Sequence, residues 1–487
     1  MVHRSLAMMA ALLVSLPAVA ASSEVERLRA ELDALKAQYE RRLADLEARL
    51  AAAEAGRQAA SNEKGELGGE VKDRLGAVAA STAFNPQISL ILDGVYYRDN
   101  RNGAITSWYE GLDGINHGHG EGGHSHGGAI DSGFNLRPTE LIFSAAVDPW
   151  FDATVMATID SEGGVTLEQA YVDAKRMPAG LSLRVGKFLS GIGYLNDKHP
   201  HQWDFVDQNL PYRTLLGEGL NDTGIQLTWL PPTGRLYTRL GVEAFQGNDQ
   251  PYATSGVTLP TQRADGNPLA AGAAGGFTAK RAGPRLWTLF AKVSPELPQN
   301  HALLLGAWRA WSRQHQELHD HSAEEPAAYV HGLEGKSRLW GVEAVYKYDA
   351  PGSYGAGDWT VAAEYLRLVK DLRVAFHELP AQVGQPRTFT QDGFYVQALY
   401  GVAPRWQVGV RYDLSGLTNE VRLPVGKRAW DDSRRWSWVA TYHFSEYSRL
   451  RLQWSRVNLA VDGDRHTGHE VWLQYQHSLG AHGAHTF

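Results

Sequence analysis

The chain ends, from Val471 to Phe487, with the sequence VWLQYQHSLGAHGAHTF. Apolar and polar side chains alternate at its start, with Val471, Leu473 and Tyr475 on one parity, and Leu479 and Phe487 keep that parity. Strict alternation predicts a β-strand with one apolar face. A terminal aromatic residue on such a strand is typical of the last strand of a membrane-spanning β-barrel, so this end of the chain predicts the fold.

The composition agrees with such a barrel. The 487 residues include 15 Trp, 20 Tyr and 51 Gly, yet the mean hydropathy is only −0.34. A transmembrane barrel needs apolar residues on its outer face alone, so its mean hydropathy stays low. A net charge of −7 and a pI near 6.3 provide no basic surface for nucleic acid. The chain has no cysteine, which excludes thiolate metal sites and cysteine nucleophiles.

Residues 1–20 have the pattern of a secretory signal peptide. His3 and Arg4 form its polar start, Leu6–Leu16 an apolar core too short to span a bilayer, and Ala18–Ala20 an A-x-A cleavage site. We expect the mature protein to begin near Ala21. Later segments lack the run of about 18 apolar residues that a transmembrane helix requires, so residence in a membrane requires a barrel.

Residues 22–55 contain neither Gly nor Pro and are rich in Ala, Glu, Leu and Arg. Their apolar residues follow steps of three and four, which predicts a coiled coil with one stutter near Tyr39. This α-helical segment would lie in the periplasm and hold the protein as an oligomer, and we expect a homotrimer. Residues 56–83 are predicted to be a polar linker.

Residues 84–487 are predicted to form an all-β transmembrane barrel of about 16 antiparallel strands. One parity of each strand is apolar or aromatic and the other is polar or small, as for a wall between lipid and water. The strands are predicted to begin near Ile88, Leu136, Phe151, Val165, Leu181, Thr223, Leu236, Leu286, Leu303, Arg338, Trp359, Phe394, Trp406, Trp436, Leu450 and Val471.

The connections between these strands alternate in length, which supports the barrel. Seven short turns carry Pro, Gly or other turn-forming residues. Eight other connections, most of them long, are predicted at Asn100–Ser132, Ser161–Gly164, Leu189–Asp222, Gly247–Pro284, Ser312–Ser337, Lys370–Asp392, Leu414–Ser433 and Leu459–Thr467. Seven turns and eight loops are the count for sixteen strands with both ends of the barrel on the periplasmic side.

Histidine is the strongest local signal. The first external loop contains His117, His119, His124 and His126 among glycines, and the predicted fifth loop contains His315, His319 and His321. Neutral imidazole is a good ligand for zinc, copper or nickel, so these seven residues are candidate ligands for Zn²⁺ or another divalent cation. The alternative is a solvated loop without a ligand. No resident cofactor is required by this interpretation.

Arginine recurs on the polar parity of the last four strands, at Arg405, Arg411, Arg435, Arg449 and Arg451. Inward arginine rows favour anions in a pore. The alternative is an ordinary transverse field, in which arginines face acidic groups without a specific ligand.

The third loop is predicted to fold into the barrel and narrow it. It is long, and Trp203, Phe205 and Tyr212 would require partners to pack against. The alternative is a packed external lid. Its candidate constriction residues are Asp197, Lys198, His199, His201, Asp204, Asp207 and Arg213.

A leader, a short coiled coil and a sixteen-strand barrel resemble the phosphate-selective porin O/P type, and Gly186-Lys187-Phe188 is similar to the G-K-F element of that group. The segments NPQISLILDGVYY, GKFLSGIGYLNDKHPHQWDFVD and SLGAHGAHTF resemble porin-like barrels described as zinc-regulated TonB-dependent outer-membrane receptors. The resemblance covers residues 85–487. It implies a porin fold in outer-membrane lipid and an association with metal.

These features together predict a bacterial outer-membrane porin for passive diffusion of small hydrophilic solutes, associated with divalent-metal uptake through external His loops. One alternative is an anion or phosphate-type porin that uses the arginine rows, and another is a surface-binding protein with a closed lumen. An enzyme such as a lipase or protease is not expected, because no G-x-S-x-G element or Ser/His/Asp set stands out.

Overall fold

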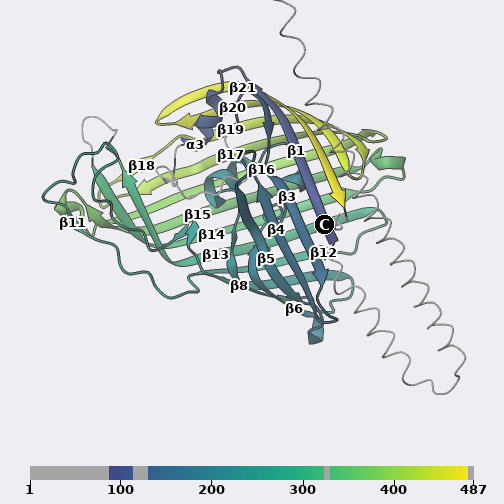
Figure 1. The fold of residues 1–487 in the computed structure, drawn as a ribbon, viewed down its shortest axis with the longest axis horizontal. Coiled ribbons are helices and arrows are strands. Elements are labelled where there is room, and N and C mark those ends of the chain that lie inside the picture. Colours follow the sequence, from purple (N-terminus) through teal and green to yellow (C-terminus); the bar gives the residue numbers. More distant parts are fainter. Residues whose placement is uncertain (1–86, 113, 115–129, 323–328, 481–487) are drawn as a thin grey trace, which may run out of the picture. The chain divides into compact units, whose positions relative to one another are not determined.

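The computed structural model describes residues 87–112, 114, 130–322 and 329–480 (Figure 1). Within this part of the chain sixteen antiparallel strands form a closed barrel. The predicted signal peptide, coiled coil and linker lie outside the described residues. So do Phe487 and the four candidate ligands of the first loop, His117, His119, His124 and His126.

The wall follows the predicted strand order. Its strands are β1 (Gln87–Asp99), β2 (Gly133–Leu136) continued by β3 (Thr139–Ala146), β4 (Phe151–Ile159), β5 (Val165–Ala174), β6 (Leu181–Leu189), β7 (Asn221–Trp229), β8 (Leu236–Phe245), β12 (Leu286–Pro295), β13 (His301–Asp320), β14 (Val330–Tyr348), β15 (Trp359–His377), β16 (Pro386–Ala403), β17 (Trp406–Arg422), β19 (Ser433–Ser445), β20 (Ser448–Val461) and β21 (Asp464–Gly480).

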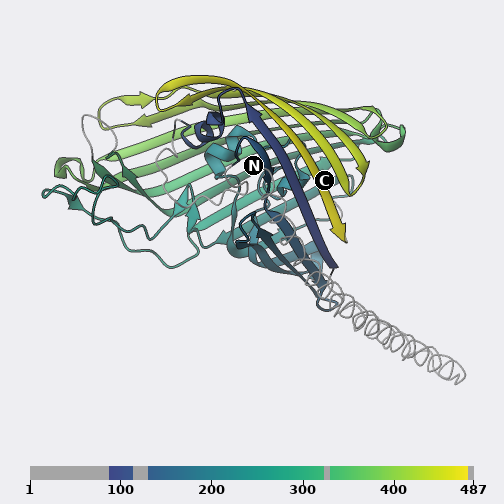
Figure 2. The same ribbon diagram turned by 45° about the horizontal axis from the view of Figure 1, so that its top comes forward.

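Each strand pairs with the strand before it, and β1 also pairs with β21, from Ser89 opposite Gly480 to Asp99 opposite Glu470. Figure 2 shows β1 beside the last strands of the chain. Because this pairing removes both free edges, every wall strand has a neighbour on each side. The prediction of a sixteen-strand antiparallel barrel is confirmed.

Short elements occupy the connections. They are α3 (Ala104–Glu110), η1 (Pro178–Gly180), η2 (Pro200–Gln202), η3 (Tyr212–Leu216), β9 (Asp249–Gln250), β10 (Ala253–Thr254), β11 (Ala274–Gly275), η4 (Ser353–Gly355), η5 (Pro380–Gln382) and β18 (Lys427–Ala429). In the described ranges no helix is long and apolar enough to cross a membrane.

The predicted short turns match the connections at one end of the barrel, but four loops at the other end were predicted too long. The β13–β14 hairpin continues to Asp320 and Val330, and β15 and β16 likewise continue to His377 and Pro386. The outward parity of these extensions is polar, as at Glu334, Asp371 and Thr388, so they lack the apolar outer face by which the sequence marks a membrane strand. The last loop reduces to Asp462-Gly463, both with positive φ, a two-residue hairpin turn.

The outer face of the wall has an apolar band between two aromatic rows. The row near the short turns includes the contacting pairs Trp359–Tyr400 and Trp406–Tyr442. The second row includes the contacts Phe394–Tyr412 and Tyr412–Trp436, six residues further along the same strands, and continues through Tyr365 and Trp340. Six residues of strand correspond to about 20 Å. An apolar band between aromatic girdles is the surface of a barrel that spans a membrane.

Candidate functional site

The third loop occupies the interior of the barrel. Residues 190–220 leave the wall after β6 and return at β7, and most of their side chains are buried. Apolar side chains of the loop and of the wall form one buried cluster. The loop contributes Ile192, Tyr194, Leu195, Tyr212, Leu215, Leu216 and Leu220. The wall contributes Phe188, Phe245, Leu286, Phe290, Leu304, Trp308, Ala310, Leu339, Val345, Ala362, Leu366, Leu368 and Tyr395. The loop therefore lies against the inner face of the wall.

One carboxylate in the wall holds the start of this loop. Glu364 on β15 accepts hydrogen bonds from the backbone N–H of Tyr194 at 3.0 Å and from the hydroxyls of Tyr212 and Tyr395. Gly193 has φ +64°, and a side chain there would lie 2.8 Å from the Glu364 carboxylate. Glycine is thus required both by the backbone conformation and by the close approach of the loop to Glu364.

Asp207 holds the middle of the loop through two of the predicted lumen arginines. Its Oδ1 accepts from Arg411 Nη2 at 2.7 Å, and its Oδ2 pairs with Arg435 Nη1. Arg435 also donates to Asp413 on β17 at 2.8 Å. All four side chains are buried. Arg411 and Arg435 are therefore neutralised by carboxylates and bind the loop to the wall.

Arg449 and Arg451 on β20 contact the same loop in another way. Arg451 donates to Gln474 at 2.6 Å and to the carbonyl of Phe205 at 3.2 Å, and Arg449 donates to the carbonyl of Trp203 at 3.2 Å. Neither makes an ion pair with a carboxylate in the part of the chain that the structure describes. Their positive charge thus stays on the inner face beside the loop.

Arg405 was predicted to face the lumen, and this is wrong. It lies in the short turn between β16 and β17 with φ +68°. Its guanidinium stacks 4.7 Å from the ring centre of Tyr354 and donates to the carbonyl of Phe444. The prediction extended the alternation of the neighbouring strand to Arg405. This residue lies in a turn, where alternation does not decide which face a side chain occupies.

The remaining predicted constriction residues are spread along the loop. Lys198 Nζ lies 3.2 Å from the ring centre of Tyr194, and Arg213 stacks on Tyr109 of α3 at 4.8 Å. Asp204 accepts from Gln397 on β16 at 2.6 Å, and Asp197 is half-buried. The loop brings these charges inside the barrel without gathering them at one point.

His199 and His201 lie together on the β3–β5 side of the interior. Their rings are parallel, with centres 5.8 Å apart. His201 Nδ1 lies 2.5 Å from a Glu140 carboxylate oxygen, and His199 Nε2 is hydrogen-bonded to Gln169. A cavity of about 20 Å³, lined in part by Glu140 and His199, adjoins them, which is room for about one water molecule.

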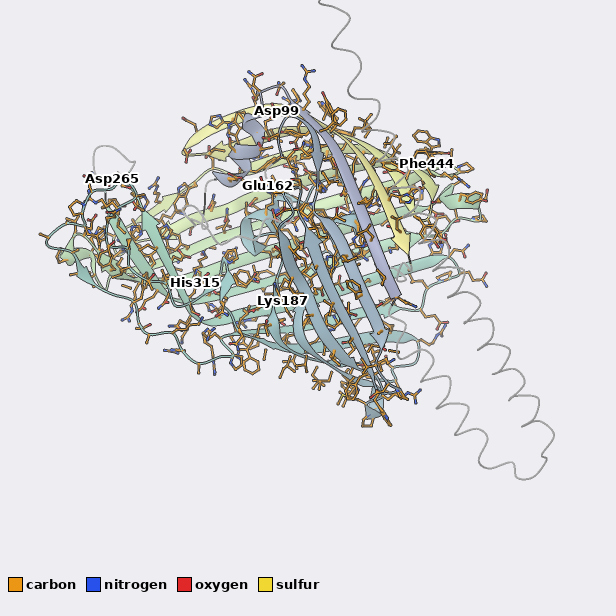
Figure 3. The ribbon with its side chains drawn as sticks, in the orientation of Figure 1. Asp99, Glu162, Lys187, Asp265, His315 and Phe444 are labelled. Carbon is orange, nitrogen blue, oxygen red and sulfur yellow. The ribbon has the colours of Figure 1, made fainter. Side chains whose placement is uncertain are left out.

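The histidines predicted in the fifth loop belong to the wall instead. His315 and His319 lie on β13, beyond the second aromatic row. His321 is the first residue after that strand. The Glu317 carboxylate accepts from His315 Nε2 and from His319 Nε2, at 2.5 and 2.9 Å. Figure 3 shows His315 between the barrel body and the loop end marked by Asp265, away from Phe444 at the turn end.

Sequence reasoning missed two further histidines. His331 on β14 and His377 on β15 lie beside His319 and His321, with ring centres of neighbouring histidines 5.0 to 5.7 Å apart. Burial and then the neighbouring imidazoles lower the pKa of His331 to about 2, so its ring is neutral at physiological pH. Both histidines stand alone in the sequence, and only strand pairing brings them beside the segment 315–321, whose sequence is HQELHDH.

No family model matches this chain. Its similarity to solved structures includes OmpT, an outer membrane protein of Vibrio cholerae, at 8 % identity over 81 % of this chain and 99 % of that one, with a TM-score of 0.47. An anion-selective porin from Comamonas acidovorans is 9 % identical over the same shares, with a TM-score of 0.45. At these identities and TM-scores, neither likeness carries an argument about function.

A sequence relative is much closer. An uncharacterised protein of Aquifex aeolicus (strain VF5) is 34 % identical over 426 residues, which are 85 % of this chain and 84 % of the relative. Identity at this level over 85 % of the chain indicates a common fold and origin. The chain therefore belongs to the same protein family as this Aquifex protein.

Proposed function

We propose that this protein is a bacterial outer-membrane channel for passive diffusion of small hydrophilic solutes, narrowed by its third loop. The observation that carries the proposal is a closed sixteen-strand wall with an apolar outer band and an inner loop tied to it at Glu364 and Asp207. A sixteen-strand wall encloses more space than its own side chains fill. The loop therefore restricts an aqueous passage.

A planar-bilayer recording of the refolded full-length protein tests this function. We expect discrete conductance steps in a neutral salt solution. A variant in which residues 197–215 are replaced by a short Gly-Ser linker should conduct more, because the segment that fills the interior is removed. A folded barrel that inserts but conducts in neither form would contradict the channel and favour the surface-binding protein with a closed lumen.

Anion selectivity is the second candidate, and Arg449 and Arg451 favour it. Both lie on the inner face without a carboxylate ion pair among the described residues. A reversal potential on the anion side in a salt gradient, moved toward zero by Arg449→Gln, would support an anion or phosphate-type porin. A potential on the cation side would exclude it.

Divalent-metal uptake is the narrower form of the channel proposal. It is supported by the histidines at the loop end of β13 and β14, which are His319, His321 and His331. A homotrimer and a periplasmic coiled coil stay predictions. Hydrolysis of an ester or peptide by the pure protein, abolished by one substitution, would favour an enzyme over all of these channels.

A further inference from the structure

Strand pairing places histidines of three strands side by side. His319 on β13 is directly opposite His331 on β14, and His331 is directly opposite His377 on β15. Directly opposite residues have Cβ atoms about 5 Å apart. The three imidazoles therefore form a row across the sheet at the loop end of the barrel.

Two β-bulges put these residues on the inner face. Between Ser312 and His315, β13 has one residue more than β14, so the odd-numbered residues, which face lipid lower on the strand, turn inward. A second shift, between Val374 and Phe376, turns His377 to the same face. Glu317 and Lys370 on that face form a buried ion pair.

Three of the histidines have the composition of a metal site and lie near one another. One nitrogen each of His319, His321 and His331 lie within 4.8 Å of one another. Tetrahedral zinc with Zn–N bonds of about 2.0–2.1 Å requires ligand nitrogens about 3.4 Å apart. The rings are nearly parallel, within 4 to 7°. Ligation therefore requires rotation about χ2, which directs the lone pairs at one ion.

The surroundings of His319 and His331 suit ligation. His319 Nε2 donates a hydrogen bond to the Glu317 carboxylate at 2.9 Å, the carboxylate–histidine arrangement found behind metal ligands. His331 Nδ1 is buried and has no hydrogen-bond partner within the described residues. A buried polar atom without a partner is costly, and an ion would satisfy it.

His377 differs from the other three. Its Nδ1 accepts the backbone N–H of Leu379 at 2.8 Å, so the neutral ring carries its proton on Nε2. The ring packs on Tyr329 instead, with centres 5.1 Å apart. His377 thus borders the site without a nitrogen available for an ion.

We propose that His319, His321 and His331 bind one borderline divalent cation of the zinc, nickel or copper class, with a fourth position open to water. Three imidazoles and no carboxylate among the ligands exclude Ca²⁺ and Mg²⁺, which require oxygen ligands. The site lies at the loop end of the barrel, beyond the second aromatic row. It deepens the metal part of the proposed function but does not require the barrel to conduct.

Zinc titration of the refolded full-length protein by calorimetry tests the site. The parent for all variants carries His117, His119, His124 and His126 as Gln, which removes the predicted ligands of the first loop. We expect one zinc ion per chain, and His331→Gln should weaken it by about 100-fold, because even an outer-shell partner contributes about 10–100-fold. His321→Gln, at a half-buried position, is the second variant in case His331→Gln does not fold.

The matched controls are His377→Gln, in the same row, and His301→Gln, at the opposite end of β13; both should leave zinc affinity unchanged. Folding of each variant is checked by the β-sheet signal in circular dichroism and by the heat-dependent shift of the protein band in gel electrophoresis. Unchanged zinc affinity in folded His331→Gln and His321→Gln would overturn the site. Bilayer conductance of the same variants is scored separately, so loss of zinc with normal conductance supports the site, and absent conductance with zinc retained contradicts only the channel.

Discussion

Asp207 shows how single residues hold the interior together. It lies between Arg411 of β17 and Arg435 of β19, which also share Asp413. Four buried charges of alternating sign satisfy one another, although none could be buried alone. Asp207 is therefore one of the two carboxylates, with Glu364, that bind the loop to the wall.

Asp207→Asn should loosen the third loop. Loss of the charge leaves two buried arginines facing one carboxylate, and removing one partner of a buried pair costs about 3–5 kcal/mol. We expect a lower free energy of unfolding in urea and a larger, noisier single-channel conductance. Glu296→Gln is the control, because its pair with Arg235 is exposed and worth about 0–1 kcal/mol. Equal effects of both variants would contradict the role given to Asp207.

Glu378 connects the fourth loop to the rim of the barrel. It accepts the backbone N–H of Ala270 at 2.6 Å and of Val330 at 2.8 Å, and it pairs with Arg263 at 3.0 Å. Burial alone would raise the pKa of Glu378, but these hydrogen bonds outweigh it and hold the pKa below its usual range.

This pKa shift predicts a pH dependence of the fourth loop. A carboxylate with a lowered pKa stabilises the folded state above the pKa of the unfolded chain, about 4.3, and that stabilisation is lost as the pH falls further. Limited proteolysis within residues 255–283 should thus accelerate below about pH 4 in the wild type. Glu378→Gln should cleave rapidly already at neutral pH. A cleavage rate that is the same at low pH and in Glu378→Gln as in the wild type at neutral pH would contradict the role of Glu378 in holding the fourth loop.

At the scale of elements, the bulges decide what the extended strands present. On β13 the odd residues Leu305 and Arg309 face outward, whereas the odd residues His315, Glu317 and His319 are buried inside. Regular pairing cannot produce both, because side chains alternate with period two. One extra residue at the bulge resolves the conflict.

Deletion of Arg313 should therefore remove the histidine cluster without destroying the barrel. The deletion restores regular pairing, and the residues after it change faces together. We expect the heat-dependent gel shift that is typical of a folded barrel, but no zinc binding in the calorimetric titration. Deletion of Asn300, in the short turn before β13, is the control, since it leaves the bulge in place. Zinc binding retained after deletion of Arg313 would show that the bulge does not position the cluster.

At the scale of the whole molecule, closure of the sheet separates two surfaces. The outer one is apolar between two aromatic rows, and the inner one carries the ion pairs and the third loop. Neither surface requires the predicted segment 22–55, whose function is expected to be assembly of several chains.

Removal of residues 22–55 tests that expectation. The shortened chain should fold, because the barrel closes through its own strands. It should sediment as a monomer in detergent, whereas we expect the full chain to sediment as a trimer. Sedimentation velocity of both proteins, with strand circular dichroism as the check on folding, measures this. A trimer that persists without the segment would place the oligomer contacts on the barrel.

The sequence alone determined the strand order, the strand number and the outward face, because period-two alternation and turn residues are local. It could not show that β13 to β16 extend beyond the membrane, since the outward parity of these extensions is polar and lacks the pattern of a membrane strand. It found His315, His319 and His321 but missed His331 and His377, and it placed Arg405 in the lumen. The histidine cluster depends on strand register and bulges, and the position of the third loop depends on the Asp207 contacts. Both join residues far apart in the chain, so they exist only in the folded barrel.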